Sequence, residues 1–467
     1  MIWPTRKGGA VAAAPALSVV PSPAVETPAP PVPKLVVPTR ADRQTDLKVD
    51  LHQRLIERIN LSALETMTRE QISSEVSDIV QDMLVEQNHA LNFAERRELV
   101  DDILDELLGL GPLEPLLKDP TITDIMVNTC NVVFVERRGK IEEVKTRFKD
   151  DRHLLRIIQK IVGAVGRRID ESSPMVDARL ADGSRLNAII PPLAVDGPLL
   201  SIRKFSKTPI DMSKLVGYGA LPQEAAEVLL GIVEARRNVI ISGGTGSGKT
   251  TMLNALSAAI DGSERILTIE DSAELQLQQR HVVRLETRPP NIEGRGEISQ
   301  RELVKNALRM RPDRIVLGEI RAGEAFDMLQ AMNTGHDGSM TTVHANTPRD
   351  ALSRIEQMIG MSGIDISPKS ARAQIAAAIH VVLQLARLSD GSRRVMSISE
   401  VTGQEGETVL MQEIFRYTRT GVDENGKVLG HFEATGIRPK FMEHLQARGI
   451  KLSPDLFDPT RKLLAST

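Results

Sequence analysis

The sequence has few aromatic residues and a single cysteine, and each shortage excludes a class of protein. Only 3% of the 467 residues are aromatic, which is too few for a platform on which successive nucleic-acid bases stack. Cys130 is alone, so the chain has no internal disulfide and no cysteine-based zinc site. No run of about eighteen apolar residues occurs, so the sequence predicts no membrane-spanning helix. The net charge of −3 argues against nucleic acid as the main partner.

The first 39 residues contain many prolines among alanine and valine, and almost no charge. Such a segment cannot hold a helix or bury a core, so we expect residues 1–39 to form a disordered, polyproline-like tail. Arg6 and Lys7 with the apolar stretch after them resemble a secretory signal, but Pro15 interrupts that stretch and argues against one.

Residues 40–118 carry apolar side chains at helical spacing with charged residues between them, which predicts a helical bundle. The apolar positions are Leu51, Leu55, Ile59, Ile79, Met83, Val85, Leu99, Ile103, Leu107 and Leu108.

Residues 119–208 alternate between short β-like runs and one helical segment, which predicts an α+β domain. We expect strands at 124–127, 132–136, 186–190 and 199–205. The helix between them would have an apolar face formed by Leu154, Ile157, Ile158, Ile161 and Val165. Prolines and glycines in residues 209–222 indicate a linker, and residues 223–467 begin a strand–loop–helix unit typical of a nucleotide-binding α/β domain.

The strongest motif is a complete P-loop, G-x-x-x-x-G-K-T, between a β-branched strand and a helix expected at 252–260. Its glycines allow successive backbone N–H groups to face phosphate oxygens. Lys249 would reach the β- and γ-phosphates of ATP, and the Thr250 hydroxyl would bind Mg²⁺. The predicted nucleotide-binding residues are Gly243, Gly244, Thr245, Gly246, Ser247, Gly248, Lys249, Thr250 and Thr251.

Two later apolar runs end in acidic residues. The run 266–269 is followed by Glu270 and Asp271, which we expect near the phosphates, polarising a water molecule or holding hydrated Mg²⁺. A solvated loop is the alternative for this pair. The apolar run 315–317, which follows Arg314, is followed by Gly318 and Glu319, with glycine where a Walker B motif has its Mg²⁺-linked aspartate. Thr250 and water would then hold the ion, and Glu319 is a candidate general base.

Two histidines lie in the stretch Gly-His-Asp-Gly-Ser-Met-Thr-Thr-Val-His, namely His336 and His344. They could form a metal pair, but a third ligand is not evident. We favour a sensor of the γ-phosphate, or a relay to the sheet. A structural histidine is the alternative for His336.

Together these motifs resemble the Walker A motif, Asp box, atypical Walker B motif and His box of bacterial secretion-superfamily ATPases. The string 304–314 and the later Thr-Val-His-Ala-Asn-Thr-Pro look specifically like the CpaF branch, the motors of tight-adherence (Flp) pili. The likeness extends from the helical segment to the C-terminus. A Cys-x-x-Cys pair, as in motors of the GspE kind, is lacking.

The resemblance implies a RecA-like ATPase domain at 223–467, an α+β (PAS-like) N-terminal domain, and homohexameric rings. It also implies arginine fingers from the N-terminal domain, for which the matching residues are Arg179, Arg185 and Arg203. Glu319, Glu270, His344 and His336 would complete the catalytic set, and Mg²⁺ would be held by Thr250, Glu270 and Asp271.

The function implied by the resemblance is a cytoplasmic ATPase, peripheral at the inner membrane, that drives assembly of a tight-adherence pilus, or its assembly and retraction. Its partners would be inner-membrane platform proteins and, indirectly, pilin. A type IV secretion or conjugation ATPase that exports protein or DNA–protein complexes is the alternative. A nucleic-acid motor would require a basic, aromatic channel that the sequence does not supply. A non-catalytic nucleotide sensor is disfavoured by the complete motif set.

Overall fold

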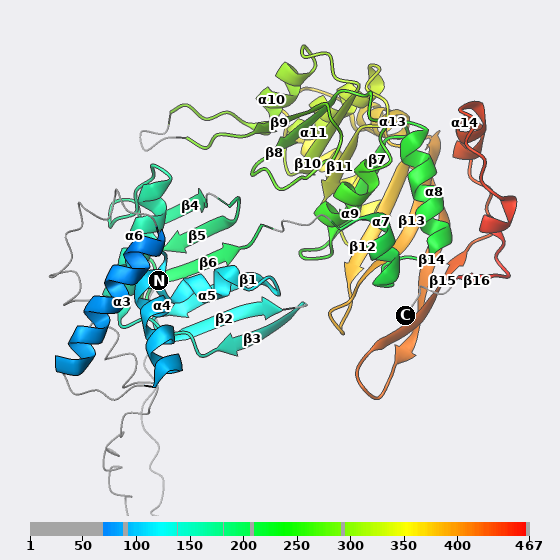
Figure 1. The fold of residues 1–467 in the computed structure, drawn as a ribbon. Coiled ribbons are helices and arrows are strands. Elements are labelled where there is room, and N and C mark those ends of the chain that lie inside the picture. The colour runs from blue at the N-terminus through cyan, green and yellow to red at the C-terminus, as the bar shows by residue number, and fades with distance from the viewer. Residues whose placement is uncertain are drawn as a thin grey trace, which may run out of the picture. The chain divides into compact units, whose positions relative to one another are not determined.

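The computed structural model describes residues 69–86, 92–137, 139–180, 182–205, 210–290 and 295–463 (Figure 1). The expected proline-rich tail and residues 40–68 of the expected helical bundle, with Leu51, Leu55 and Ile59, lie outside these ranges. Among the described helices, every one is too short or too polar to cross a bilayer.

The first two described helices, α3 (Arg69–Glu86) and α4 (Phe93–Leu108), pack on each other. The buried stripe of α3 consists of Ile72, Val76, Val80 and Met83, one residue per turn. Val85, predicted on this face, is instead 75% exposed because it lies off the stripe. The α4 helix begins at a capping box, in which Asn92 and Glu95 each accept the other's backbone N–H.

The N-terminal domain has a described sheet of six antiparallel strands in the order β3-β2-β1-β6-β5-β4. The strands are β1 (Ile122–Thr129), β2 (Val132–Arg137), β3 (Lys140–Val144), β4 (Met175–Arg179), β5 (Arg185–Ile189) and β6 (Leu199–Arg203). A short turn η1 (Gly111–Leu113) and helix α5 (Glu114–Lys118) lead into it. The prediction of an α+β domain is confirmed, although β3 and β4 had not been predicted.

Helix α6 (Asp151–Ala164) provides much of this domain's core. Four of the five predicted apolar positions, Leu154, Ile157, Ile158 and Ile161, are buried. The fifth, Val165, is 37% exposed because the helix has already ended there. Asp150 caps the helix by accepting the backbone N–H of His153.

The C-terminal domain has a mixed sheet of ten described strands, ordered β16-β15-β14-β13-β12-β7-β11-β10-β8-β9. From β12 to β9 every neighbouring pair is parallel, and from β12 to β16 every pair is antiparallel. The strands are β7 (Val239–Gly243), β8 (Ile266–Glu270), β9 (Val282–Glu286), β10 (Arg314–Ile320), β11 (Met340–Val343), β12 (Val381–Arg387), β13 (Arg393–Glu405), β14 (Thr408–Val422), β15 (Val428–Ala434) and β16 (Lys462–Leu463).

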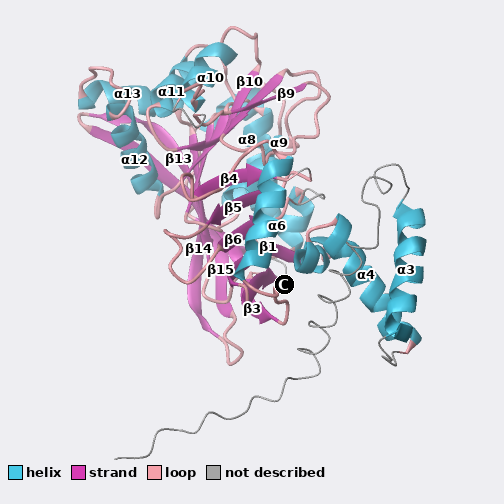
Figure 2. Ribbon diagram, turned by 90° about the vertical axis from the view of Figure 1, so that its left-hand side faces the viewer, coloured by secondary structure: helices cyan, strands magenta, loops and turns pink. Residues whose placement is uncertain are grey.

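Helices cover both faces of this sheet. Helices α10 (Gln300–Ala307), α11 (Glu324–Asn333), α12 (Pro348–Gly360) and α13 (Pro368–Ala378) pack together as one layer (Figure 2). Helices α7 (Met212–Gly217), α8 (Gln223–Glu234), α9 (Lys249–Ser257) and α14 (Phe441–Ala447) pack on the other side, and a turn η2 (Pro454–Phe457) precedes β16. In β7, Val239 and Ile241 face one core and Ile240 faces the other.

The segment 209–222, expected to be a linker, contains helix α7. Asp211 caps this helix by accepting the backbone N–H of Lys214, and Met212 and Leu215 are buried in the C-terminal core. The segment therefore contributes to the core of the C-terminal domain, because its apolar residues recur at helical spacing between the glycines and prolines.

Candidate active site

The P-loop connects β7 to α9, and its backbone requires glycine. Gly246 and Gly248 have φ values of +69° and +95°, a left-handed conformation that other residues rarely adopt. At Gly243, a Cβ atom would lie 2.7 Å from the carbonyl oxygen of Leu385 on β12. The loop is thus shaped by close approach of neighbouring backbone as well as by turn geometry.

Lys249 is the first residue of α9 and is only 8% exposed. Its Nζ donates hydrogen bonds to the carbonyl oxygens of Gly243 and Gly244, both at 3.0 Å. Burial is the main cause that lowers the pKa of this ammonium group, and the charge of Glu319 opposes it. The ammonium group is therefore held inside the loop, at the position where it would meet phosphate oxygens.

Strands β8, β10, β11 and β7 are parallel neighbours, so their carboxyl ends lie at one edge of the sheet. Glu270 ends β8, Glu319 is the penultimate residue of β10, and His344 directly follows β11. The P-loop follows β7. Three predicted side chains are therefore gathered beside the phosphate-binding loop by topology alone.

Glu270 is a buried carboxyl group with one unsatisfied oxygen. Its Oε2 accepts the backbone N–H groups of Glu274 and Leu275, at 2.7 and 2.9 Å. Its Oε1 is buried and has no hydrogen-bond partner among the described residues. Burial raises the pKa of Glu270 to about 7, against the effect of the two backbone hydrogen bonds. A carboxyl group with such a pKa can accept and release a proton near neutrality.

Gly318 lies beside this carboxyl group. The register pairs Leu317 with Ile269, so the next step along both strands brings Gly318 next to Glu270. A Cβ atom at position 318 would lie 3.0 Å from Cγ of Glu270. The glycine at the Walker B aspartate position thus makes room for the Glu270 side chain.

Glu319 and Lys249 meet at one nitrogen of His344. His344 Nε2 lies 2.7 Å from Glu319 Oε1 and 3.1 Å from Lys249 Nζ. One ring nitrogen cannot donate to the carboxylate and accept from the ammonium at the same time. The pKa of His344 is lowered, chiefly by burial, which favours the neutral ring. The two contacts of His344 are therefore alternatives, and they link the P-loop to the end of β10.

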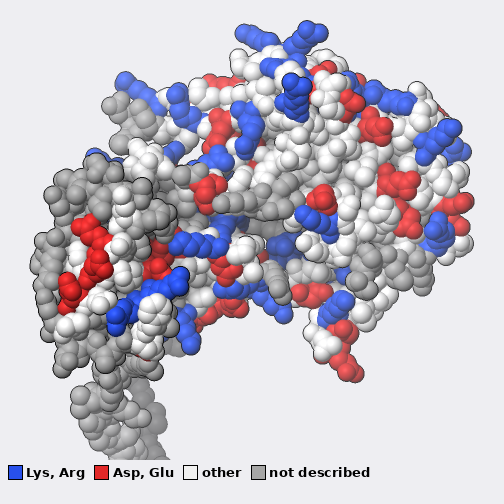
Figure 3. All heavy atoms as spheres, viewed as in Figure 1, with Lys and Arg blue, Asp and Glu red and all other residues white. Residues whose placement is uncertain are grey.

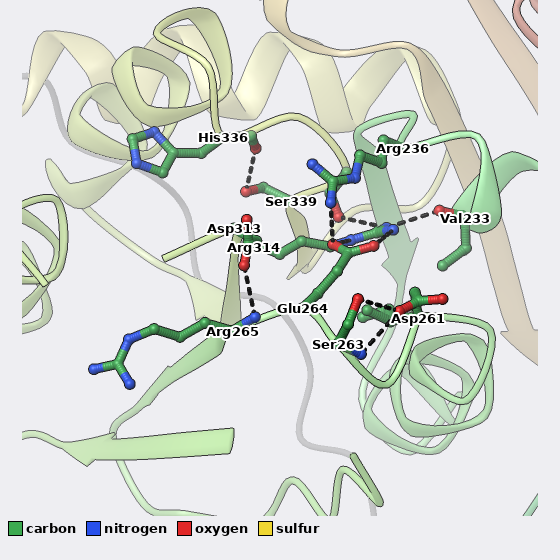
Figure 4. A network of polar contacts seen from close by, with 12 residues as sticks. Val233, Arg236, Asp261, Ser263, Glu264, Arg265, Asp313, Arg314, His336 and Ser339 are labelled. Carbon is green, nitrogen blue, oxygen red and sulfur yellow. Dashed lines mark hydrogen bonds and ion pairs between the residues drawn. The ribbon is translucent and has the colours of Figure 1, made fainter. Parts of the chain in front are cut away.

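The structure does not bring His336 to this site. His336 precedes β11 and His344 follows it, so the two lie at opposite ends of a parallel strand. His336 Nδ1 is 3.2 Å from the carbonyl oxygen of Ala331, and its own carbonyl accepts the Ser339 hydroxyl (Figure 4). Among the described residues there is no group of three His, Cys, Asp or Glu side chains that could hold a metal ion.

At that opposite end of the sheet lies a buried ion-pair network (Figure 4). Arg314 is fully buried and donates to both carboxylate oxygens of Glu264, at 2.7 and 2.9 Å. Arg236 Nη2 is 3.2 Å from the same carboxylate. Gly338 has a φ of +84°, and a Cβ atom there would lie 2.5 Å from Arg314 Nη1. In the Gly-His-Asp-Gly stretch, Gly338 thus serves to admit this guanidinium group.

The three predicted arginine fingers each have an acidic partner. Arg185 Nη1 is 3.0 Å from Glu274 Oε1, and Arg203 Nε is 3.0 Å from Asp124 Oδ1. Arg179 Nη1 is 2.9 Å from Glu286 Oε2. Arg185 and Arg203 line a cavity of about 210 Å³ that also reaches the start of α9. Its other lining residues include Lys204, Phe205, Ile210, Thr250, Thr251, Asn254 and Gln276.

The donor set fits a hydrated Mg²⁺ better than a fully protein-ligated one, because Mg²⁺ keeps several waters and uses few carboxylates. Thr250 lies in the first turn of α9, and Glu270 offers its unsatisfied Oε1. Asp271 Oδ2 is 3.1 Å from Arg321 Nη1, which makes it a weaker candidate. When bound, the ion would supply positive charge against the phosphates.

Arg321 and Arg393 contact the site but were not among the predicted residues. Arg321 directly follows β10 and contacts Asp271 and Glu319. Arg393, at the start of β13, donates from Nε to the carbonyl oxygen of Gly246 at 2.8 Å. Arg321 could have been predicted, because it is a basic residue only two positions after Glu319. Arg393 could not, because it lies far along the chain from the P-loop.

The described surface carries charge of both signs. On the face drawn in Figure 3, Lys and Arg side chains are interspersed with Asp and Glu over the described atoms. Among the described atoms of that face, the basic side chains do not form a continuous track along which a nucleic-acid backbone could lie.

Comparison with known proteins places these motifs in one family. The family model described as "Type II/IV secretion system protein" matches residues 106–435. A Mycobacterium tuberculosis protein named for conjugal transfer is 41% identical over 307 residues, or 64% of this chain and 87% of that protein. Conjugal transfer protein TrbB of Rhizobium radiobacter is 32% identical over 311 residues, 66% of this chain and 90% of that protein. The crystal structure of the VirB11 ATPase from the Brucella suis type IV secretion system, 28% identical, covers 62% of this chain and 94% of its own, with a TM-score of 0.34.

Proposed function

This chain belongs to the type II/IV secretion system protein family and is an ATP hydrolase, and from that premise we propose that it is the motor of a type IV secretion or conjugation-type machine. The names of relatives such as TrbB, which align over about nine-tenths of their own length, support conjugal transfer as the process it drives. In this proposal the motor acts at the cytoplasmic face of the inner membrane and moves protein or DNA–protein complexes through partner proteins there.

The observation that carries the catalytic part of the proposal is the shared sheet edge. The P-loop, Glu270, Glu319 and His344 lie at the carboxyl ends of neighbouring parallel strands. We assign the P-loop backbone and Lys249 to binding of ATP phosphates, and Thr250 to Mg²⁺. In this proposal Glu319 orients the attacking water, and Glu270 exchanges a proton with it.

We further propose that six copies form a ring, with a RecA-like C-terminal domain and a PAS-like N-terminal domain. Arg185 and Arg203 would then stabilise charge on the transferred phosphoryl group. The test is steady-state ATP hydrolysis against protein concentration, with light scattering on the same samples. Specific activity should rise as a six-fold species forms, and Arg185→Ala and Arg203→Ala should keep ATP affinity but lose turnover. Constant specific activity from a monomer would refute the ring and the arginine assignment.

A tight-adherence pilus motor of the CpaF type is the second candidate. Helices α3 and α4 begin before residue 106, where the family match starts, and the relatives named above cover 64–66% of this chain. An N-terminal extension of this kind, together with the string 304–314, favours a pilus motor whose partners are platform proteins and, indirectly, pilin.

The two candidates can be distinguished in the organism that carries this chain. Lys249→Ala should abolish ATP binding, because it removes the charge inside the P-loop. If transfer of a conjugative plasmid is lost while surface pili remain, the secretion or conjugation assignment holds. If pili are lost while transfer remains, the tight-adherence assignment replaces it.

A further inference from the structure

The turn after β10 holds Arg321 in a fixed place. The backbone N–H groups of Arg321 and Ala322 both donate to Oε1 of Glu324, at 2.6 and 2.7 Å. Glu324 is 7% exposed, so this carboxylate is itself confined. Next in the turn, a Cβ atom at Gly323 would lie 2.8 Å from Cα of Ser362. Close packing and two hydrogen bonds therefore determine where the Arg321 side chain starts.

The guanidinium group of Arg321 uses all three of its nitrogens on two carboxylates. Nε and Nη2 contact Oε2 of Glu319, at 2.9 and 2.7 Å. Nη1 lies 3.1 Å from Oδ2 of Asp271. These carboxylates stand at the ends of adjacent parallel strands, β10 and β8. One planar group thus fixes the carboxylate at the end of β10 relative to the carboxylate that follows β8.

The remaining Glu319 oxygen, Oε1, is the one that meets His344. Each oxygen of Glu319 therefore has its own partner: Oε2 contacts Arg321, and Oε1 contacts His344. Without Arg321, the Oε2 atom of Glu319 would lose both of its guanidinium contacts, and Glu319 and Asp271 would lose the positive group that lies between them. The Arg321 side chain is 57% exposed, and exposed ion pairs contribute at most about 1 kcal/mol to stability. Its main effect is then on the arrangement of the carboxylates.

We propose that Arg321 is a positioning residue for ATP hydrolysis, which acts by orienting Glu319 against the carboxylate of Asp271. The proposal rests on the role assigned above to Glu319. Lysine cannot replace arginine here, because a single ammonium group cannot bridge two carboxylates in a fixed planar geometry.

The test is a double-mutant cycle in the full chain, with Arg321→Gln, Glu319→Gln and the double variant. Misplacing a catalytic group by about 1 Å can cost on the order of 100-fold. We expect Arg321→Gln to lower kcat by 10- to 100-fold on that basis, with the KM for ATP little changed. In the Glu319→Gln background it should cause no further loss, because residues that act as a unit are non-additive.

Two further variants complete the design. Arg419→Gln, an exposed arginine on β14, is the matched control and should keep the parental kcat. Arg321→Lys should recover less than half of the lost activity, and it carries the test if Arg321→Gln does not fold. Folding is checked by circular dichroism, and binding by titration with a fluorescent ATP analogue.

Three results would overturn the positioning role. They are a parental kcat in Arg321→Gln, a full additional loss on top of Glu319→Gln, and a raised KM with unchanged kcat, which would make Arg321 an ATP-binding residue. If Glu319→Gln itself keeps the parental kcat, the role of Glu319 is wrong instead, so the two failures can be told apart.

Discussion

The raised pKa of Glu270 predicts that replacing this residue by glutamine stabilises the protein at high pH. Its pKa changes from 4.5, the ordinary value, to about 7 in the folded chain. Between pH 4.5 and 7 the Glu270 carboxyl group is therefore deprotonated in the unfolded chain but protonated in the folded chain. The free energy of unfolding consequently decreases as the pH rises through this interval. A shift of this size corresponds to about 3 kcal/mol above pH 7.

Glutamine has the shape of the protonated carboxyl group and does not titrate. Its carbonyl oxygen can accept the two backbone N–H groups that Glu270 Oε2 now accepts. Glu270→Gln should therefore exceed the parent in free energy of unfolding by about 3 kcal/mol at pH 8, and by under about 1 kcal/mol at pH 5. The gain in stability comes from a residue that we assign to catalysis, so turnover should fall.

Urea unfolding followed by circular dichroism at both pH values measures this difference, and hydrogen exchange of peptides from β8 confirms that the C-terminal domain is the part affected. Glu424→Gln, in the exposed turn between β14 and β15, is the matched control and should change neither value. A stability difference that is the same at pH 5 and pH 8, or a loss of stability at pH 8, would refute the reasoning.

The other predictions concern the two ends of the parallel strands. Gly318→Ala should lower kcat at least about 10-fold with ATP affinity retained, because its Cβ displaces Glu270; nucleotide titration beside turnover measures this, and parental kcat would contradict it. Arg314→Met should cost about 3–5 kcal/mol in urea unfolding, because it leaves a buried carboxylate without its main partner; a loss below about 1 kcal/mol would contradict this. His344→Ala should lower kcat while His336→Ala leaves it unchanged, and equal losses in both variants would show that the placement of His336 is wrong.

The motifs near the phosphates could be predicted because their signals are local. A β-branched strand, a glycine-rich loop and a following helix occur together in one short stretch, and the structure has β7, the loop and α9 there. Apolar runs followed by acidic residues likewise predicted strands β8 and β10. Strand β3 was missed because it is largely exposed, and β4 was missed because its five residues include only one that is buried, Val176.

What the sequence could not provide depends on contacts between distant segments. His336 and His344 look equivalent in the sequence, and only the position of β11 between them separates their environments. Gly318 was noted as a missing aspartate, but its reason lies in the side chain of Glu270 on the neighbouring strand. Arg314 was part of a recognised string, and its burial against Glu264 became evident only when the strand ends were placed in three dimensions.

Strand β10 has a fixed residue at each end. At one end Arg314 is enclosed by its carboxylate and carbonyl partners, and at the other Glu319 is held by His344 and Arg321. A strand advances about 3.3 Å per residue, so the five steps between them set a spacing of roughly 16 Å. Adding or deleting one residue there would also turn Leu317 from one core toward the other. The number of residues in this strand is thus as constrained as their identity, and a length change here should be tolerated less well than one in the exposed turn between β14 and β15.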